Sequence, residues 1–204
     1  MEDNVQKDLD LVLKQDQYRT YIGDHISNVR LAWDNIKKSQ TCMHVIDLHR
    51  KLIVNPQEEL INNINIAAGA IPQSYMISHL IEIHDLSKYS DDEFEGYRQY
   101  FYPVDGEEKD ENEMNKAFKH HYMNNPHHPE FWTNFKLQEY IPVNYIVEMA
   151  CDWIAMSIFN GKQNALDWYN SSDKKTMLGK AQANLIEELL WTYYKEYNID
   201  GTEK

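Results

Sequence analysis

The sequence predicts an all-α fold in a single domain. Apolar residues recur at steps of three and four along most of the chain, which is the spacing of one face of an α-helix. No segment shows the alternation of apolar and polar residues that is typical of a strand. Only 7 glycines and 6 prolines interrupt the 204 residues, so long helices are easily accommodated. That length also suits one domain with one sizeable core.

In the first half of the chain, helix boundaries follow from caps and breakers. The first expected helix covers residues 16–38 and has an apolar stripe from Tyr18 to Ile36. A second is expected at 55–69, where a proline in the first turn is followed by two acids. A third runs from the cap Ser74 to His84. Residues 90–93, Ser-Asp-Asp-Glu, have the form of a capping box and should open a fourth, ending near residue 103.

The second half continues the helical pattern. The expected elements are an acidic loop at 104–112, a helix from Asn112 or Asn115 through His121, a proline-interrupted turn at 124–129, an apolar helix at 143–159, and a helix pair at 164–169 and 174–197. Pro142 lies at the start of the apolar helix and Gly161 stops it.

The balance of charges narrows the classes of partner. The chain has 33 acidic and 20 basic side chains, a formal net charge of −13. A surface that wraps nucleic acid or lies on anionic lipid needs a basic face. A long nucleic acid and a membrane surface are therefore not expected partners, although a small basic patch stays open. The oligomeric state also stays open, with a homo-oligomer among the options.

Cysteine usage and the N-terminus indicate a cytoplasmic protein. Cys42 and Cys151 are far apart and have no metal-like spacing, so no disulfide framework is expected. That absence suits a reducing cytosol. Residues 1–6 carry charges and no apolar run, so no signal peptide is expected. No stretch approaches the roughly 18 uninterrupted apolar residues of a membrane span.

Several of the nine histidines lie where the helical pattern calls for an apolar residue. His25 lies in the stripe of the first helix, between Ile22 and Val29. A lone histidine of this kind is more often a buried neutral side chain with one hydrogen bond. His84, however, also lies on an apolar face and is followed directly by Asp85. A buried carboxylate is costly unless it is paired or bound to a metal, so this pair favours a ligand role.

The apolar helix at 143–159 contains two acids. Glu148 and Asp152 are four residues apart and therefore share one face. They could instead face solvent along a narrow strip, or pair with Arg30 or Lys88. Because the helix is apolar nearly all round, a buried cation is the better explanation.

The densest group of histidines is His120, His121, His127 and His128. His121 aligns with the apolar side of its helix, which makes it the expected inward member of its pair. Periodicity does not distinguish His127 from His128. The alternative is a surface tract that binds metal adventitiously. His44, His49 and His79 have no such neighbours and are expected to be ordinary surface or core residues, and Arg98 in a tyrosine-rich run could hold an anion.

Together these residues form a candidate ligand set for a divalent transition metal. In chain order they are His25, His84, Asp85, His120 or His121, His127 or His128, and Asp152. Imidazoles and carboxylates suit Mn, Fe, Ni or Zn, and the candidate set contains no thiolate. Because one aspartate can bridge two cations, the set can hold one or two ions. Two ions can promote phosphoryl transfer by stabilising the attacking and leaving oxygens.

The motifs resemble those of known families. The order H…HD…H…HH…D and the stretch His84-Asp85-Leu86-Ser87-Lys88 resemble the HD-domain superfamily of metal-dependent phosphohydrolases, especially its HD-GYP branch. The elements HDLSK, EF-x-x-Y-x-x-YFYP, HH-x-x-x-NPHHP and EM-x-x-DW are similar to DUF5662, a family of uncharacterised phage and bacterial proteins. That similarity spans about residues 18–160, and the helices at 162–198 follow it.

The resemblance implies an HD-domain-like helical bundle over residues 1–204 and a role for each site residue. His25, His84, Asp85 and Asp152 would bind a first metal, and Asp85 would bridge to a second one held by His121 (or His120) and His127 (or His128). Lys88 would contact the substrate phosphate, with Arg98 as a further candidate, and His128 would protonate the leaving group. Glu148 would orient a ligand imidazole, as would His120 if it is not itself a ligand. The location would be bacterial cytoplasm, or host cytoplasm for a phage-encoded protein.

The expected function is a phosphohydrolase that cleaves a phosphoester of a nucleotide or another small phosphorylated molecule. Two alternatives use the same residues. One is a di-iron oxygenase, because some HD-domain relatives activate dioxygen, and the other is a non-catalytic protein that binds or sequesters a nucleotide. The lysine after the HD pair favours hydrolysis.

Overall fold

The computed structural model describes residues 2–53 and 73–204 of the chain. Most of these residues are helical, and the only β-type pairing among them is an isolated antiparallel bridge between Tyr197 and Glu203. The all-α prediction is therefore confirmed for the described residues, whereas the helix predicted at 55–69 lies outside them. Within the same residues, no helix combines the length and the apolar character that crossing a membrane requires.

The chain divides into two compact units. Unit 1 contains the residues up to Ile26 together with Asp85–Asn125, and unit 2 contains Ser27–His84 and Pro126–Lys204. The boundary at Ile26 falls inside helix α1, which spans Glu2–Lys38 and so starts earlier than the sequence pattern indicated. A single domain over residues 1–204 stays a prediction.

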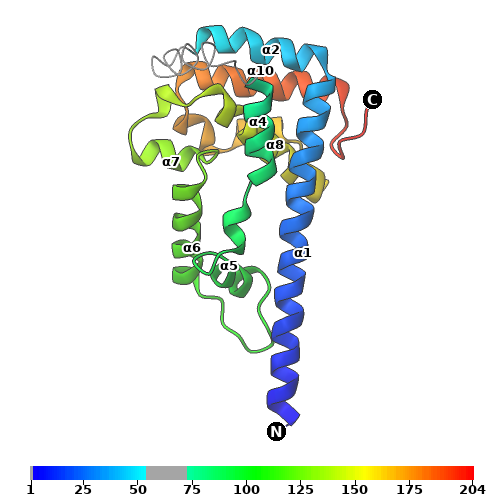
Figure 1. The fold of residues 1–204 in the computed structure, drawn as a ribbon, viewed down its shortest axis with the longest axis vertical. Helices are drawn as coiled ribbons and strands as arrows, with labels where there is room; N and C mark the ends of the chain where they lie inside the picture. Colours follow the sequence, from blue (N-terminus) through cyan, green and yellow to red (C-terminus); the bar gives the residue numbers. More distant parts are fainter. Residues whose placement is uncertain (1, 54–72) are drawn as a thin grey trace. The chain divides into compact units, whose positions relative to one another are not determined.

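Unit 1 is built from the first part of α1, η1 (Leu86–Tyr89), α5 (Phe94–Phe101) and α6 (Glu111–Asn124). Its small core consists of Tyr18, Ile22, Ile26, Tyr97 and Ala117. Helices α5 and α6 lie side by side (Figure 1). Their contact is close at Gly96, where a Cβ atom would lie 2.8 Å from a backbone oxygen of α6. Only glycine allows this approach without a shift of the backbone.

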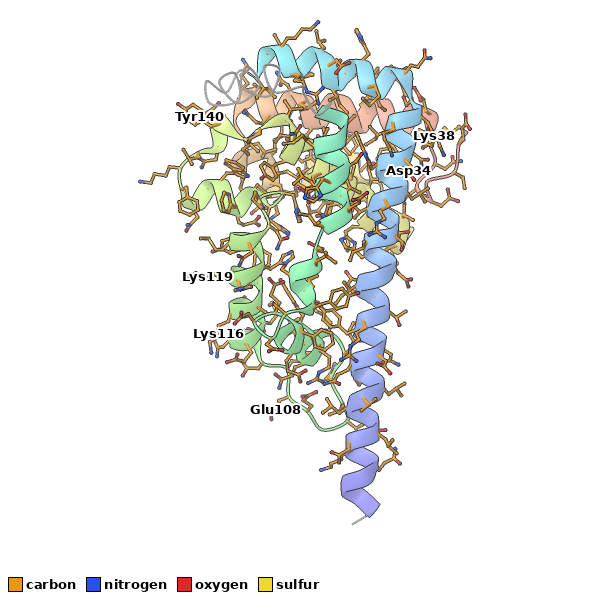
Figure 2. The ribbon with its side chains drawn as sticks, viewed as in Figure 1. Asp34, Lys38, Glu108, Lys116, Lys119 and Tyr140 are labelled. Atoms are coloured by element: carbon orange, nitrogen blue, oxygen red, sulfur yellow. The ribbon has the colours of Figure 1, made fainter. Side chains whose placement is uncertain are left out.

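The acidic loop between α5 and α6 is anchored rather than simply solvated. Glu107 in this loop accepts hydrogen bonds from the guanidinium of Arg98, which is buried on α5. Glu108, the next residue, is exposed (Figure 2). Helix α6 begins after Asp110, whose side chain accepts from the backbone N–H groups of residues 112 and 113. The helix therefore starts before the predicted position at Asn112 or Asn115, because Asp110 already satisfies the free N–H groups of its first turn.

Unit 2 contains most of the helices and the larger core. Its elements after α1 are α2 (Gln40–Leu52), α4 (Gln73–Ile83), α7 (Pro129–Asn134), η2 (Gln138–Tyr140), α8 (Val143–Asn160), α9 (Ala165–Ser171), η3 (Asp173–Met177) and α10 (Lys180–Glu196). Helix α8 is central, since α4, α9, α10 and α2 all contact it. Helix α2 runs alongside α10 (Figure 1).

Several boundaries in unit 2 test the sequence predictions. Helix α8 begins after Pro142 and ends at Gly161, which has a positive φ of 62°, so both predicted limits are confirmed. Helix α2 was not predicted, although Ser39 caps it by accepting from the backbone N–H of Cys42. The helix predicted at 174–197 ends at the C-cap of α10 but starts too early, because the chain leaves η3 and begins α10 only after Gly179. A side chain at Gly179 would collide with Glu139, so this glycine permits a close approach to η2.

Candidate functional site

Asp85 is the centre of a buried cluster in unit 1. It lies just before η1 with a left-handed backbone, φ 58° and ψ 13°, and is 1% exposed. Aspartate tolerates this conformation better than most non-glycine residues. Backbone strain of this kind persists where the surrounding structure enforces it, which is often at functional sites.

Two imidazoles and one ammonium surround the Asp85 carboxylate. His25 Nε2 lies 3.2 Å from Oδ2, and His121 Nε2 lies 3.1 Å from Oδ1. The Lys88 ammonium donates to Oδ2 at 2.5 Å. The structure therefore brings together four of the predicted site residues, His25, Asp85, Lys88 and His121, within unit 1.

Glu93 also belongs to this cluster, although the sequence pattern predicts that it caps a helix. The predicted capping box at 90–93 is wrong, because the Glu93 side chain makes no capping hydrogen bond and is fully buried. Its Oε1 accepts from His120 Nδ1 and its Oε2 accepts from His121 Nδ1, both at 2.8 Å. Its position in the EF-x-x-Y motif was the one available signal, and nothing in that motif points to His120 or His121.

Charge and hydrogen bonding offset the cost of burial here. Burial by itself would raise the pKa of Glu93, but the hydrogen bond and charge of His121, with help from His120, hold it below its ordinary value. Burial would likewise lower the pKa of His121, but the adjacent Asp85 carboxylate outweighs it and raises that pKa. The charged forms of these groups therefore stabilise one another.

Unit 2 holds a second cluster at α8. Glu148 Oε1 accepts from His84 Nδ1 at 3.0 Å and from His127 Nδ1 at 3.1 Å. The His84 Nε2 atom lies 3.7 Å from Asp152 Oδ1, and the His84 and His127 rings are 4.3 Å apart between centroids. His128 lies next to His127, with a ring separation of 4.4 Å. Five predicted residues therefore come together within this unit.

The electrostatics of Glu148 resemble those of Glu93. Burial by itself would raise the pKa of Glu148, but the charge and hydrogen bond of His127, together with His84, hold it below its ordinary value. Glu148 contacts these two imidazoles, whereas the alternative pairing of Asp152 with Arg30 or Lys88 stays a prediction. The Arg30 guanidinium donates to the backbone oxygen of Glu82 at 3.4 Å.

The donor atoms of both clusters suit a divalent transition metal. His84, His127 and Glu148 each offer one ligand atom, and these atoms lie within 4.8 Å of one another. In unit 1, an imidazole nitrogen lies beside each oxygen of Asp85. Buried imidazole and carboxylate donors are the chemistry that such ions prefer. The buried cluster of unit 2 could therefore hold a metal ion, Asp85 offers donors of the same chemistry in unit 1, and the role of each ligand stays a prediction.

Other predicted residues lie away from these contacts. Arg98 is 1% exposed and donates to Glu95, Glu107 and the backbone oxygen of Tyr102. Its guanidinium thus anchors a loop, and the geometry offers no support for a contact with substrate. Among the histidines with no assigned role, His44 and His79 are exposed and His49 is buried against Glu188 at 2.7 Å.

The comparisons with known proteins give one match. No curated protein matches the chain, and no solved structure does either. A model of the family described as a family of unknown function, DUF5662, matches residues 14–192. This match covers the motif-bearing residues of both clusters and extends beyond the range 18–160 that the motifs indicated. The chain therefore belongs to the DUF5662 family.

Proposed function

We propose that this protein is a metal-dependent phosphohydrolase that cleaves a phosphoester of a small phosphorylated molecule, with nucleotides as the first class to test. The observation that carries the proposal is the buried Asp85 carboxylate, which has an imidazole beside each oxygen and the Lys88 ammonium at 2.5 Å. The similarity of the HDLSK stretch to the HD-domain superfamily supports the same reading.

The donor set determines what the site would hold. We assign His25, Asp85 and His121 as the residues that would hold a divalent ion in unit 1, and His84, His127 and Asp152 as those that would hold one in unit 2. An ion held there would supply Lewis acidity for the attack of water on a phosphorus atom.

Two further side chains have proposed roles toward substrate. Lys88 is largely buried, and an ammonium group is a common phosphate ligand, so we assign it to the phosphate oxygens. His128 is half-buried immediately before α7, and we assign its imidazole to proton donation to the leaving group. Because the chain carries a formal charge of −13, this local positive charge would be needed to attract a phosphorylated substrate.

The first experiment measures metal content and hydrolysis together. Purified protein is analysed for bound metal and then incubated with Mn²⁺ or Fe²⁺ and a panel of nucleotides and other phosphomonoesters and phosphodiesters. We expect at least one bound ion per chain and release of phosphate or monophosphate from some substrate. A protein that binds metal but leaves the whole panel intact would refute the proposed activity.

Matched variants test the site. Asp85→Asn keeps the shape of the side chain and its tolerance of the left-handed backbone, so the fold should survive while metal is lost. Asp152→Asn tests the unit 2 cluster in the same way. Asp91→Asn removes an equal charge from an exposed position and should keep its metal. Full metal retention in both Asp85→Asn and Asp152→Asn would overturn the ligand assignment.

A further inference from the structure

We infer that Glu93 is a positioning residue of this site, whose carboxylate holds His121 so that its Nε2 atom is presented to a metal ion at Asp85. The inference rests on the proposed function, because it concerns the same ion. It adds a residue that is not itself assigned as a ligand and that acts through the imidazole of His121.

The geometry separates the two nitrogens of His121. Its Nδ1 donates to Glu93 Oε2 at 2.8 Å, while its Nε2 lies 3.1 Å from Asp85 Oδ1. An imidazole whose Nδ1 carries the hydrogen can offer Nε2 as a ligand. A carboxylate on the other nitrogen also fixes the ring orientation and makes the ligand nitrogen more basic. Glu93 is fully buried, so water cannot substitute for it.

A similar arrangement of one glutamate and two histidines occurs in unit 2. Glu148 also accepts from the Nδ1 atoms of two imidazoles, those of His84 and His127. In both units one buried glutamate therefore faces the Nδ1 side of two histidines. A buried carboxylate is costly, and imidazoles are not the only donors that can satisfy it, since the Ser87 hydroxyl also hydrogen-bonds to Glu93. The repeated choice of imidazole Nδ1 indicates that the orientation of the rings is what the two glutamates provide.

The two glutamates differ in one respect that makes the inference testable. Glu93 uses both oxygens, Oε1 for His120 and Oε2 for His121, whereas Glu148 uses Oε1 for both of its partners. A glutamine has one carbonyl oxygen and one amide NH₂ group. At position 148 the carbonyl can keep both hydrogen bonds, and only the charge is lost.

At position 93 a glutamine cannot keep both. Wherever its NH₂ group faces an Nδ1 atom, that nitrogen must become an acceptor, and the ring hydrogen moves to Nε2. If His121 receives the NH₂ group, its Nε2 can no longer bind a metal. If His121 receives the carbonyl, it keeps its orientation but loses the charged partner that raises its basicity. Either outcome weakens metal binding.

The experiment measures Mn²⁺ affinity of the full chain by isothermal titration calorimetry, with Co²⁺ absorption as a spectroscopic check. Thermal unfolding of the metal-free proteins is followed in parallel by circular dichroism. We expect Glu93→Gln to weaken Mn²⁺ affinity by about 10- to 100-fold, the usual effect of losing such a partner, and to change the Co²⁺ spectrum. Glu148→Gln should weaken it less. Glu113→Gln, at an exposed position on α6, is the matched control and should bind as the wild type does.

Glu93→Asp keeps the charge on a shorter side chain and serves if Glu93→Gln does not fold. Its Mn²⁺ affinity should lie between those of the wild type and Glu93→Gln, or simply below the wild type if Glu93→Gln is lost. Wild-type affinity in either Glu93 variant, with or without a lower unfolding temperature, would overturn the inference and leave Glu93 a purely structural residue. A wild-type protein that binds metal but cleaves no phosphoester would refute the proposed activity while the affinities still decide the role of Glu93. A wild-type protein that binds no Mn²⁺ or Co²⁺ would refute both.

Discussion

Removing the Glu107 carboxylate should destabilise unit 1 by about 2–3 kcal/mol. The buried Arg98 guanidinium donates to Glu107 Oε1 at 2.7 Å and to Oε2 at 2.5 Å, and the Val104 backbone N–H donates to Oε2 at 3.0 Å. Breaking a buried ion pair typically costs about 3–5 kcal/mol, because the remaining charge is left without its partner. Here the cost should be lower, since Glu95 still pairs with Arg98 and the Glu107 side chain is 20% exposed.

Glu107→Ala is compared with Glu108→Ala, which removes the same charge from the exposed neighbour in the same loop (Figure 2). All five tryptophans lie in unit 2, so tryptophan fluorescence during urea unfolding follows that unit. Amide hydrogen exchange in α5 and α6 follows unit 1. The Glu107 variant should exchange roughly 30- to 150-fold faster than wild type there, which corresponds to about 2–3 kcal/mol. If the stabilities of unit 1 in the two variants differ by less than about 0.5 kcal/mol, the ion pair with the buried Arg98 does not stabilise this unit, and the reasoning is refuted.

The same ion pair should make stability depend on pH. The hydrogen bonds from Arg98 hold the pKa of Glu107 below its ordinary value of 4.5. A carboxyl group whose pKa is lower in the folded state contributes stability above its unfolded pKa and loses it as the pH falls through the folded pKa. The difference in the free energy of unfolding between wild type and Glu107→Ala should therefore be largest at pH 7 and shrink below about pH 4.5. A difference that grows on acidification would contradict this assignment.

Further predictions concern the glycines and the cysteines. Gly23→Ala should raise the free energy of unfolding by roughly 0.5–1 kcal/mol in urea titrations, because the added Cβ on α1 meets nothing within 4 Å, and a loss of stability would contradict this. Gly96→Ala should lower it by roughly 1–3 kcal/mol, since its Cβ would lie 2.8 Å from the backbone of α6; unchanged stability would mean that the helices separate easily. Cys42 and Cys151 are fully buried, and burial raises the pKa of the Cys42 thiol to about 11. A disulfide reagent at pH 8 should therefore label both only after denaturation, and rapid labelling of the native protein would refute their burial.

Local sequence signals predicted the elements that depend on neighbouring residues. Pro142 and Gly161 limit α8 because each restricts or permits backbone angles at its own position. The inward position of His121 followed from its spacing to apolar residues on the same helix, and the residue is 1% exposed. Both inferences need information from within a few helical turns only.

The predictions failed where several local solutions were equally good. The acidic residues before α5 and α6 offer many possible caps, so the sequence could not show that Asp110 caps α6 while Glu93 turns inward. Arg98 lies in a run that permits either an anion site or a buried ion pair, and Glu107, nine residues away, decides between them. The glycine that separates η3 from α10 acts through a contact with η2, which no local pattern reveals.

The sequence by itself determined the helical class, the limits of the central helix and the chemical nature of the candidate ligands, because these follow from residue type and spacing along one helix. Only the tertiary structure decided which nitrogen of each histidine faces which carboxylate. Glu93 and His121 are 28 residues apart, and Glu148 and His84 are 64 apart. Contacts over such separations arise from the packing of different helices, and helical periodicity carries no information about which pairs meet.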